Sequence, residues 1–276
     1  NRFMSAFGRL FLLCGSCLFL YLGALFLSKY RKDNKAMNSN SIKIIAIIAM
    51  TIDHLAWVLF PGYPVAPLPI LLHMIGRITC PIMCYFIAEG YYYTKNVNKY
   101  NARLFVFAFI SHFAYIFALG DFDGLSSFIP FYKGNILNQT SVMWSLAWGL
   151  VMLRIVNSEK IKGNTLKVLF VVLICLISFP SDWSCIASLC IMAFGTNRYN
   201  LKAQMSFMVF YVAIYAAVYF VAIDKVYGLI QLAVVLAIPI LKVYNGERGQ
   251  SPRFNNVMKW GFYIYYPLHL FILGIF

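Results

Sequence analysis

Six ionisable side chains lie within long apolar segments of the sequence. They are Asp53, His54, Arg77, Glu89, His112 and His269. At the centre of a membrane helix such a group costs roughly 3 kcal/mol, so each one is a candidate for function. Imidazole takes up a proton near neutral pH and a carboxylate can fix its tautomer, so the adjacent Asp53 and His54 indicate acid–base chemistry.

Four of these groups are expected at one depth. With a rise of about 1.5 Å per residue, His54 and His269 come out about 18 Å from the cytoplasmic end of their segments, and His112 about 14 Å. Arg77, counted from the outer side, lies at a comparable level. We therefore expect a polar layer near the centre of the membrane. His73 is nearer the outer end of its segment and falls outside that layer.

Asp53 needs a partner on another helix. Adjacent residues on a helix point about 100° apart, so we do not expect Asp53 to hydrogen-bond His54 directly. Arg77 is the natural partner, because an intramembrane ion pair would hold the two segments together. Two alternatives stay open: the pair can be purely structural, and His54 can be a core histidine with satisfied hydrogen bonds.

Two apolar segments carry a proline beside these groups. Pro81 follows Arg77 by four residues in G-R-I-T-C-P. Proline has no N–H and clashes with the carbonyl at i−4, so a kink is expected at Arg77. In Y-I-Y-Y-P-L-H, Pro267 likewise frees the carbonyl of Tyr263. Two such kinks favour a polar cavity between the helices.

The closing motif also places tyrosines beside a histidine. Tyr265 and Tyr266 lie four and three residues before His269, on the same helix face. Their depth near mid-span argues against an interfacial aromatic belt, which is the alternative interpretation.

A basic rim is expected at the cytoplasmic end of the third apolar segment. Glu89 is nearer this face than the other buried groups, and we expect it to pair with Arg103 across a short loop. Lys95, Lys99 and Arg103 could hold an anionic cytosolic ligand, although the positive-inside rule alone also accounts for them. Asp182, at an outer helix junction, is typical of a cap or a turn.

The chain that positions these groups is strongly apolar. Of its 276 residues, 62% are hydrophobic and 12% charged, with a mean hydropathy of +0.74. A soluble domain carries about a quarter charged residues, so the composition excludes soluble enzymes. The net charge of +14 falls in short clusters between apolar runs and indicates membrane topology, not nucleic-acid binding. The cysteines show no zinc-ligand spacing, and we predict no metal site.

Ten apolar segments are candidate membrane helices. They are 10–28, 42–60, 70–93, 103–119, 141–156, 165–180, 183–196, 205–223, 226–243 and 257–276. The sixth and seventh are short and could form a re-entrant hairpin. A cationic cluster follows the first segment, so we interpret it as an anchor helix, not a signal peptide. The sequence predicts an all-α polytopic membrane protein of about ten transmembrane helices around a central polar cavity.

The cations indicate how these helices are oriented. Of the 23 Lys and Arg residues, 18 fall on alternate connections, namely 29–43, 95–103, 154–167, 198–202 and 242–259. Cytoplasmic loops are enriched in cations, so we place these connections inside and both termini outside.

Four motifs, in order, resemble the TraX family, bacterial membrane proteins named for N-terminal acetylation of conjugative pilin. They are K-I-I-A-I-I-A-M-T-I-D-H (43–54), G-R-I-T-C-P (76–81), E-G-Y-Y-Y-T-K-N with K-Y-N-A-R-L (89–104) and F-Y-I-Y-Y-P-L-H-L (262–270). We therefore divide the chain into an extra N-terminal helix with a basic linker, 1–41, and a TraX-like domain, 42–276. The last motif is also loosely similar to integral-membrane acyltransferases that acetylate cell-surface sugars.

The resemblance implies an acetyltransferase of the bacterial inner membrane that uses cytosolic acetyl-CoA. Its acceptor would be a pilin-like peptide N-terminus or a surface glycan. Together with the intramembrane groups, it gives the expected catalytic residues Asp53, His54 and His269, and the expected donor- or acceptor-binding residues Arg77, Glu89, Thr94, Arg103, His112, Asp182, Tyr263 and Tyr266. The chain departs from the family pattern in its extra first helix and in the stretch 135–142, which matches only loosely.

Acetyl transfer needs a base for the acceptor's proton and a donor for the oxyanion. His54 is the expected base, and Arg77 or a tyrosine the expected donor. The CoA phosphates would lie on the basic inner loops, with the pantetheine arm reaching inward. The competing interpretation is a proton-coupled transporter, in which the same ionisable groups form a relay. A noncatalytic scaffold leaves the shared depth of these groups unexplained.

The topology is tested by cysteine accessibility. Single cysteines at Asn98 and beside Gly246, in a background without native cysteines, should resist an impermeant thiol reagent in intact cells and react after permeabilisation. The distribution of cations predicts this result. Labelling of either position in intact cells would contradict the orientation.

Overall fold

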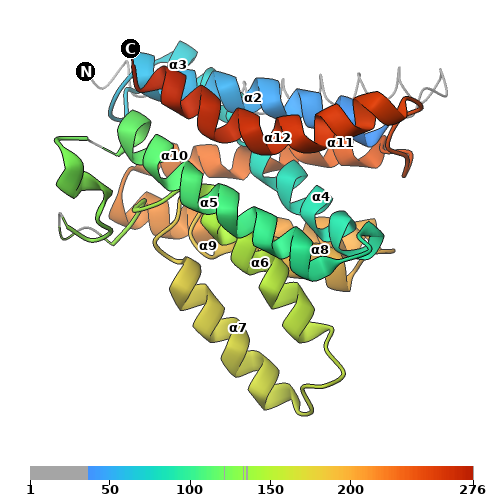
Figure 1. Ribbon diagram of the computed structural model, residues 1–276. Coiled ribbons are helices and arrows are strands. Elements are labelled where there is room, and N and C mark those ends of the chain that lie inside the picture. Colours follow the sequence, from blue (N-terminus) through green and yellow to red (C-terminus); the bar gives the residue numbers. More distant parts are fainter. Residues whose placement is uncertain (1–36, 121, 133, 135, 276) are drawn as a thin grey trace.

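The computed structural model describes residues 37–275, apart from 121, 133 and 135. Every regular element within these residues is a helix, and no strand occurs among them (Figure 1). The all-α prediction is therefore confirmed for this part of the chain. The expected helix 10–28 and the cationic cluster after it lie outside the described residues.

Nine longer helices occur in the described part of the chain. They are α2 (Ser39–Leu59), α3 (Pro67–Gly76), α4 (Thr79–Tyr93), α5 (Val97–Leu119), α6 (Val142–Val156), α7 (Asn164–Ser178), α8 (Ile186–Thr196), α9 (Leu201–Ala222) and α12 (Pro252–Leu273). Short helices α10 (Lys225–Ile230), η2 (Gln231–Leu236) and α11 (Ala237–Lys242) form one continuous run, and η1 (Leu125–Phe128) lies in a connection. The side chains of Asn38, Asn96 and Asn200 accept hydrogen bonds from backbone N–H groups in the first turns of α2, α5 and α9, which are otherwise unpaired.

Five helical segments are long and apolar enough to cross a membrane. They are Ser39–Leu59, Pro67–Tyr93, Val97–Leu119, Leu201–Ala222 and Lys225–Lys242. Three shorter apolar helices are α6, α7 and α8, and α12 completes the described chain. Each expected segment from 42 onward thus has a helical counterpart, while the number of ten membrane crossings stays a prediction.

The helices form one bundle from which α7 leans away (Figure 1). Helix α6 packs between α5 and α8, α4 packs on α8, and α12 packs on α5 and α2. The α4–α5 and α11–α12 connections lie at one end of the bundle, and the connection 120–140 lies at the opposite end (Figure 1). We call these the inner and outer ends, after the orientation expected from the cations.

The two prolines act differently. The helix ends at Gly76 and resumes at Thr79, so the break expected four residues before Pro81 is confirmed at Arg77. By contrast, α12 continues through Pro267 to Leu273, and no such break accompanies the second proline. A helix can pass a proline when one lost hydrogen bond is tolerated.

A tight turn joins α7 to α8 at the outer end. Trp183 and Ser184 have φ values of 63° and 50°, a left-handed conformation that is uncommon outside glycine. A backbone bridge between Thr140 and Ser181 ties this turn to the connection 120–140. Asp182 is part of this turn, as expected.

Candidate functional site

A buried ion pair joins α2 to the break between α3 and α4. Arg77 Nη2 donates to Asp53 Oδ2 at 2.5 Å, and each residue is only 7% exposed. Arg77 also donates from Nη1 to Gln231 Oε1 at 3.0 Å and from Nε to the His73 carbonyl at 3.3 Å. Its guanidinium lies 5.2 Å from the ring centre of Trp183. The predicted pair is confirmed, and most of its hydrogen-bonding capacity is satisfied inside the protein.

His73 is a member of this network that the sequence analysis left out. Its Nδ1 lies 2.8 Å from Asp53 Oδ1; since a carboxylate accepts, Nδ1–H donates. Its Nε2 is buried and has no hydrogen-bond partner among the described residues. The spacing of four residues to Arg77 was the available signal, because it puts both side chains on one helix face. We call Asp53, His73, Arg77 and Gln231 the anchor network.

Gly76 permits the close approach of the two helices in this network. A Cβ atom built on Gly76 would lie 2.3 Å from Asp53 Cβ and 2.6 Å from Asp53 Oδ1. Real Cβ atoms are not found so close to other atoms, so a larger residue would displace Asp53. The close packing against Asp53 thus explains why the first residue of the G-R-I-T-C-P motif is a glycine.

Two histidines form a second buried contact beside the anchor network. His54 Nδ1 on α2 lies 2.7 Å from His269 Nε2 on α12, and His269 Nδ1 lies 2.9 Å from the Tyr265 carbonyl. A carbonyl only accepts, so in two neutral imidazoles His269 Nδ1–H donates to it and His269 Nε2 accepts from His54 Nδ1–H. His54 Nε2 then carries a lone pair, and it makes no hydrogen bond to any described residue. We call this arrangement the histidine chain.

Asp53 and His54 line a small central chamber. The chamber has a volume of about 30 Å³ and is lined by Asp53 and His54 from α2, Asp182 from the α7–α8 turn and Tyr266 from α12. The buried hydroxyl of Tyr266 lies near the Ser141 hydroxyl and the backbone of Val142, but the hydroxyls of Tyr266 and Ser141 have no partner with hydrogen-bond geometry in the described chain. The polar side chains are thus packed closely around this space, and a large central cavity is not confirmed.

A larger inner pocket of about 380 Å³ opens at the inner end. Five cationic residues line it: Lys43, Lys95, Arg103, Arg248 and Lys259. None of the five forms an ion pair with a carboxylate that the structure describes. The expected residues Thr94 and Tyr263 line the same pocket. Unpaired cations around an open space are suited to an anionic ligand.

Arg103 is held in this pocket by aromatic rings. Its guanidinium carbon lies 5.8 Å from the ring centre of Tyr100 and 5.7 Å from that of Trp260. Its Nε is buried and has no hydrogen-bond partner in the described part of the chain. The side chain is therefore oriented while keeping donors free.

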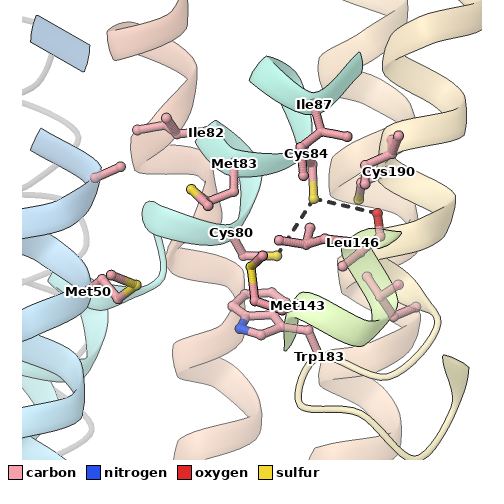
Figure 2. Close-up of a cluster of buried hydrophobic side chains, with 14 of the residues drawn as sticks. Met50, Cys80, Ile82, Met83, Cys84, Ile87, Met143, Leu146, Trp183 and Cys190 are labelled. Atoms are coloured by element: carbon pink, nitrogen blue, oxygen red, sulfur yellow. Dashed lines mark hydrogen bonds between the residues drawn. The ribbon is translucent and has the colours of Figure 1, made fainter. Parts of the chain in front are cut away.

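Methionines separate the inner pocket from the central chamber. Met83 lines both spaces, Met143 lines the inner pocket, and Met50 and Leu146 line the chamber. Figure 2 shows these side chains with Cys80 and Trp183 in one buried cluster between α2, α4 and α6. Methionine side chains are flexible and can rearrange around a ligand.

Two expected site residues lie elsewhere. His112 hydrogen-bonds the Thr140 hydroxyl at 3.1 Å and the Phe128 carbonyl at 2.8 Å, in an apolar pocket near the outer end. His112 does not line the central chamber. The expectation was based on depth along the helix, and depth does not determine which side of α5 a residue faces. His112 therefore joins the outer connection to α5 instead of joining the other histidines.

Glu89 pairs with Arg198, at 3.1 Å between Oε1 and Nε, and the expected pairing with Arg103 is wrong. Arg198 also lies over the rings of Tyr92 and Tyr93, at 4.5 and 4.9 Å. Although burial opposes the charge, the hydrogen bond that Arg198 donates to Glu89 raises the pKa of Arg198. The pair fastens α4 to the α8–α9 connection and leaves Arg103 unpaired.

Fold and site together define a polytopic, all-helical membrane protein whose buried histidines lie beyond a basic pocket. Comparison with known families gives a narrower assignment: the TraX protein family model matches residues 38–276. The chain belongs to the TraX family.

Two known proteins are similar to the chain. A probable fimbrial assembly protein FimC, serogroup H1, of Dichelobacter nodosus is 26% identical over 246 residues, covering 84% of this chain and 92% of the relative. An uncharacterised protein of Rickettsia prowazekii is 31% identical over 78 residues, covering 28% of this chain and 27% of that protein. No solved structure matches the chain.

The anchor network gives a prediction for Gly76. Gly76→Ala places a methyl group against Asp53, so we expect a loss of about 1–3 kcal/mol in the free energy of unfolding. Thermal unfolding in detergent micelles measures the loss as a lower Tm. Gly261→Ala on α12 is the matched control, because a Cβ there meets no atom within 4 Å. Equal Tm values for Gly76→Ala and the wild type would contradict the account of this motif.

Proposed function

We propose that this protein transfers an acetyl group from cytosolic acetyl-CoA to an acceptor at or across the bacterial inner membrane. The observation that carries the proposal is the position of His54: this residue, whose Nε2 makes no hydrogen bond to a described residue, lines a chamber that shares Met83 with a basic pocket at the inner end. A candidate base and a candidate anion-binding surface then lie on either side of Met83.

The inner pocket is suited to the nucleotide part of CoA. Its five cations would contact the phosphate groups, with Arg103 the best oriented of them. Charge-assisted hydrogen bonds to phosphate are strong and geometrically specific for arginine. Thr94 and the ring of Tyr263 add a hydroxyl and an apolar surface to the same wall. The pantetheine arm would pass Met83 and bring the thioester to the chamber.

In the chamber, His54 Nε2 would remove the proton of the acceptor nucleophile as it attacks the thioester carbonyl. The nucleophile forms a bond to the acyl carbon, the carbon–sulfur bond breaks, and the imidazolium returns the proton to the departing CoA thiolate. The unpartnered hydroxyl of Tyr266 is a candidate donor to the oxyanion. Arg77 is less suited to that role, since it is occupied by Asp53, Gln231 and the His73 carbonyl.

His269 and Asp53 would support His54 in different ways. His269 accepts from His54 Nδ1–H and so keeps the lone pair on Nε2, as the second partner of a catalytic histidine commonly does. Arg77 and His73 hold the carboxylate of Asp53 in place. The negative charge of this carboxylate would stabilise the His54 imidazolium that forms during the reaction. Both are positioning residues in this proposal.

The proposed acceptor is based on the role that one relative's name states. This fimbrial assembly protein favours a pilin-like peptide N-terminus, and a surface glycan is the second candidate. Asp182 lines the chamber from the outer end, so the acceptor would approach past the α7–α8 turn. This approach requires both termini and that turn to lie on the outer side, as the cations predict.

The role of His54 is tested by comparing histidine variants. Purified His54→Ala should transfer labelled acetyl from acetyl-CoA to a pilin-containing membrane extract about 10²–10⁴ times more slowly than the wild type, because a general base is lost. His112→Ala is the control, since this histidine lies outside the chamber, and should stay within a few-fold of wild type. A folded His54→Ala that retains more than about a tenth of the rate would refute the assignment. No labelled product from the wild type would favour the transporter.

The donor pocket is tested separately. Arg103→Ala should raise the KM for acetyl-CoA about 10–100-fold, the loss expected for a charge-assisted hydrogen bond to phosphate, while kcat changes little. Arg154→Ala is the control, because Arg154 hydrogen-bonds exposed Asn98 and does not line the pocket. An unchanged KM for Arg103→Ala would place the CoA phosphates elsewhere.

A further inference from the structure

The central chamber is much smaller than the pocket behind it, with about 30 Å³ against about 380 Å³. One water molecule occupies roughly 10–15 Å³ of space measured in this way. The chamber therefore has room for two or three non-hydrogen atoms. An acetyl group has two carbons and one oxygen, so it matches this space in size, whereas a longer acyl chain would have to displace the walls.

Two rigid side chains close the chamber. Leu146 is fully buried on α6, the helix packed between α5 and α8. Trp183 is 7% exposed and is held on two sides, by Arg77 over its ring at 5.2 Å and by the stacked ring of Tyr215 at 5.8 Å. Neither can move without disturbing the anchor network or the bundle core. Met50 and Met83 on the other walls can adapt more easily.

We propose that the chamber restricts the donor to a two-carbon acyl thioester, with Leu146 and Trp183 as the walls that exclude longer chains. The inference rests on the proposed use of acyl-CoA and adds the size selection of its acyl group. Close-packed interiors do not accommodate an extra methylene freely. Where apolar walls do not yield, one added methylene is discriminated against by roughly 10–200-fold.

The experiment measures binding, so it needs no acceptor. Full-length protein in lipid nanodiscs is titrated with CoA, acetyl-CoA, propionyl-CoA and butyryl-CoA. The wild type should bind acetyl-CoA at least as well as CoA and butyryl-CoA at least about tenfold more weakly. Leu146→Ala enlarges the chamber, and its preference for acetyl-CoA over butyryl-CoA should fall below about threefold.

Two further variants keep the test decisive. Val142→Ala removes two carbons from a partly exposed residue that also lines the chamber, so it serves if Leu146→Ala does not fold. Leu150→Ala is the matched control, because Leu150 is equally buried on α6 and does not line the chamber; it should keep the wild-type preference.

The outcomes separate the two proposals. Binding of CoA and acetyl-CoA, with equal affinity for all chain lengths, would overturn the size selection and leave the proposed function standing. An unchanged preference in both Leu146→Ala and Val142→Ala would overturn the assignment of this wall. Absence of binding of CoA and acetyl-CoA to the wild type would overturn the proposed function and this inference together.

Discussion

The buried ion pair between Asp53 and Arg77 is the constraint on which the rest of the site depends. A carboxylate and a guanidinium are each costly in an apolar environment, and they are tolerated together only when paired and hydrogen-bonded. Meeting that condition requires α2 to approach the α3–α4 break, which Gly76 permits. It also draws in His73, Gln231 and the ring of Trp183, which come from separate parts of the chain.

The position of His54 follows from this constraint. It is the residue after Asp53, so its side chain points about 100° around α2 from that of Asp53 and meets His269 on α12. The Tyr265 carbonyl then fixes the direction of both hydrogen bonds, which leaves a lone pair on His54 Nε2. The structural interpretation of Asp53 and the proposed catalytic interpretation of His54 are therefore compatible, because one ion pair supports the orientation of the neighbouring base.

Sequence reasoning succeeded where chemistry or local geometry decides the outcome. The need of Asp53 for a cation predicted Arg77, and the position of Pro81 predicted the helix break.

Sequence reasoning failed where the result depends on which side of a helix faces the bundle. Depth alone grouped His112 with the other histidines, and proximity in sequence suggested Arg103 as the partner of Glu89. His73 was missed because it was judged by its depth near the outer end of its segment, and not by its spacing of four residues from Arg77. The size of the chamber depends on packing between distant segments, which the sequence of each segment does not contain.

The most direct test of the account is an experimental structure of the full chain in nanodiscs with acetyl-CoA bound. The account predicts the nucleotide among Lys43, Lys95, Arg103, Arg248 and Lys259, the pantetheine arm passing Met83, and the acetyl group in the chamber beside His54 Nε2. Density for the nucleotide at the outer end, or an acetyl group that stays outside the chamber, would contradict it.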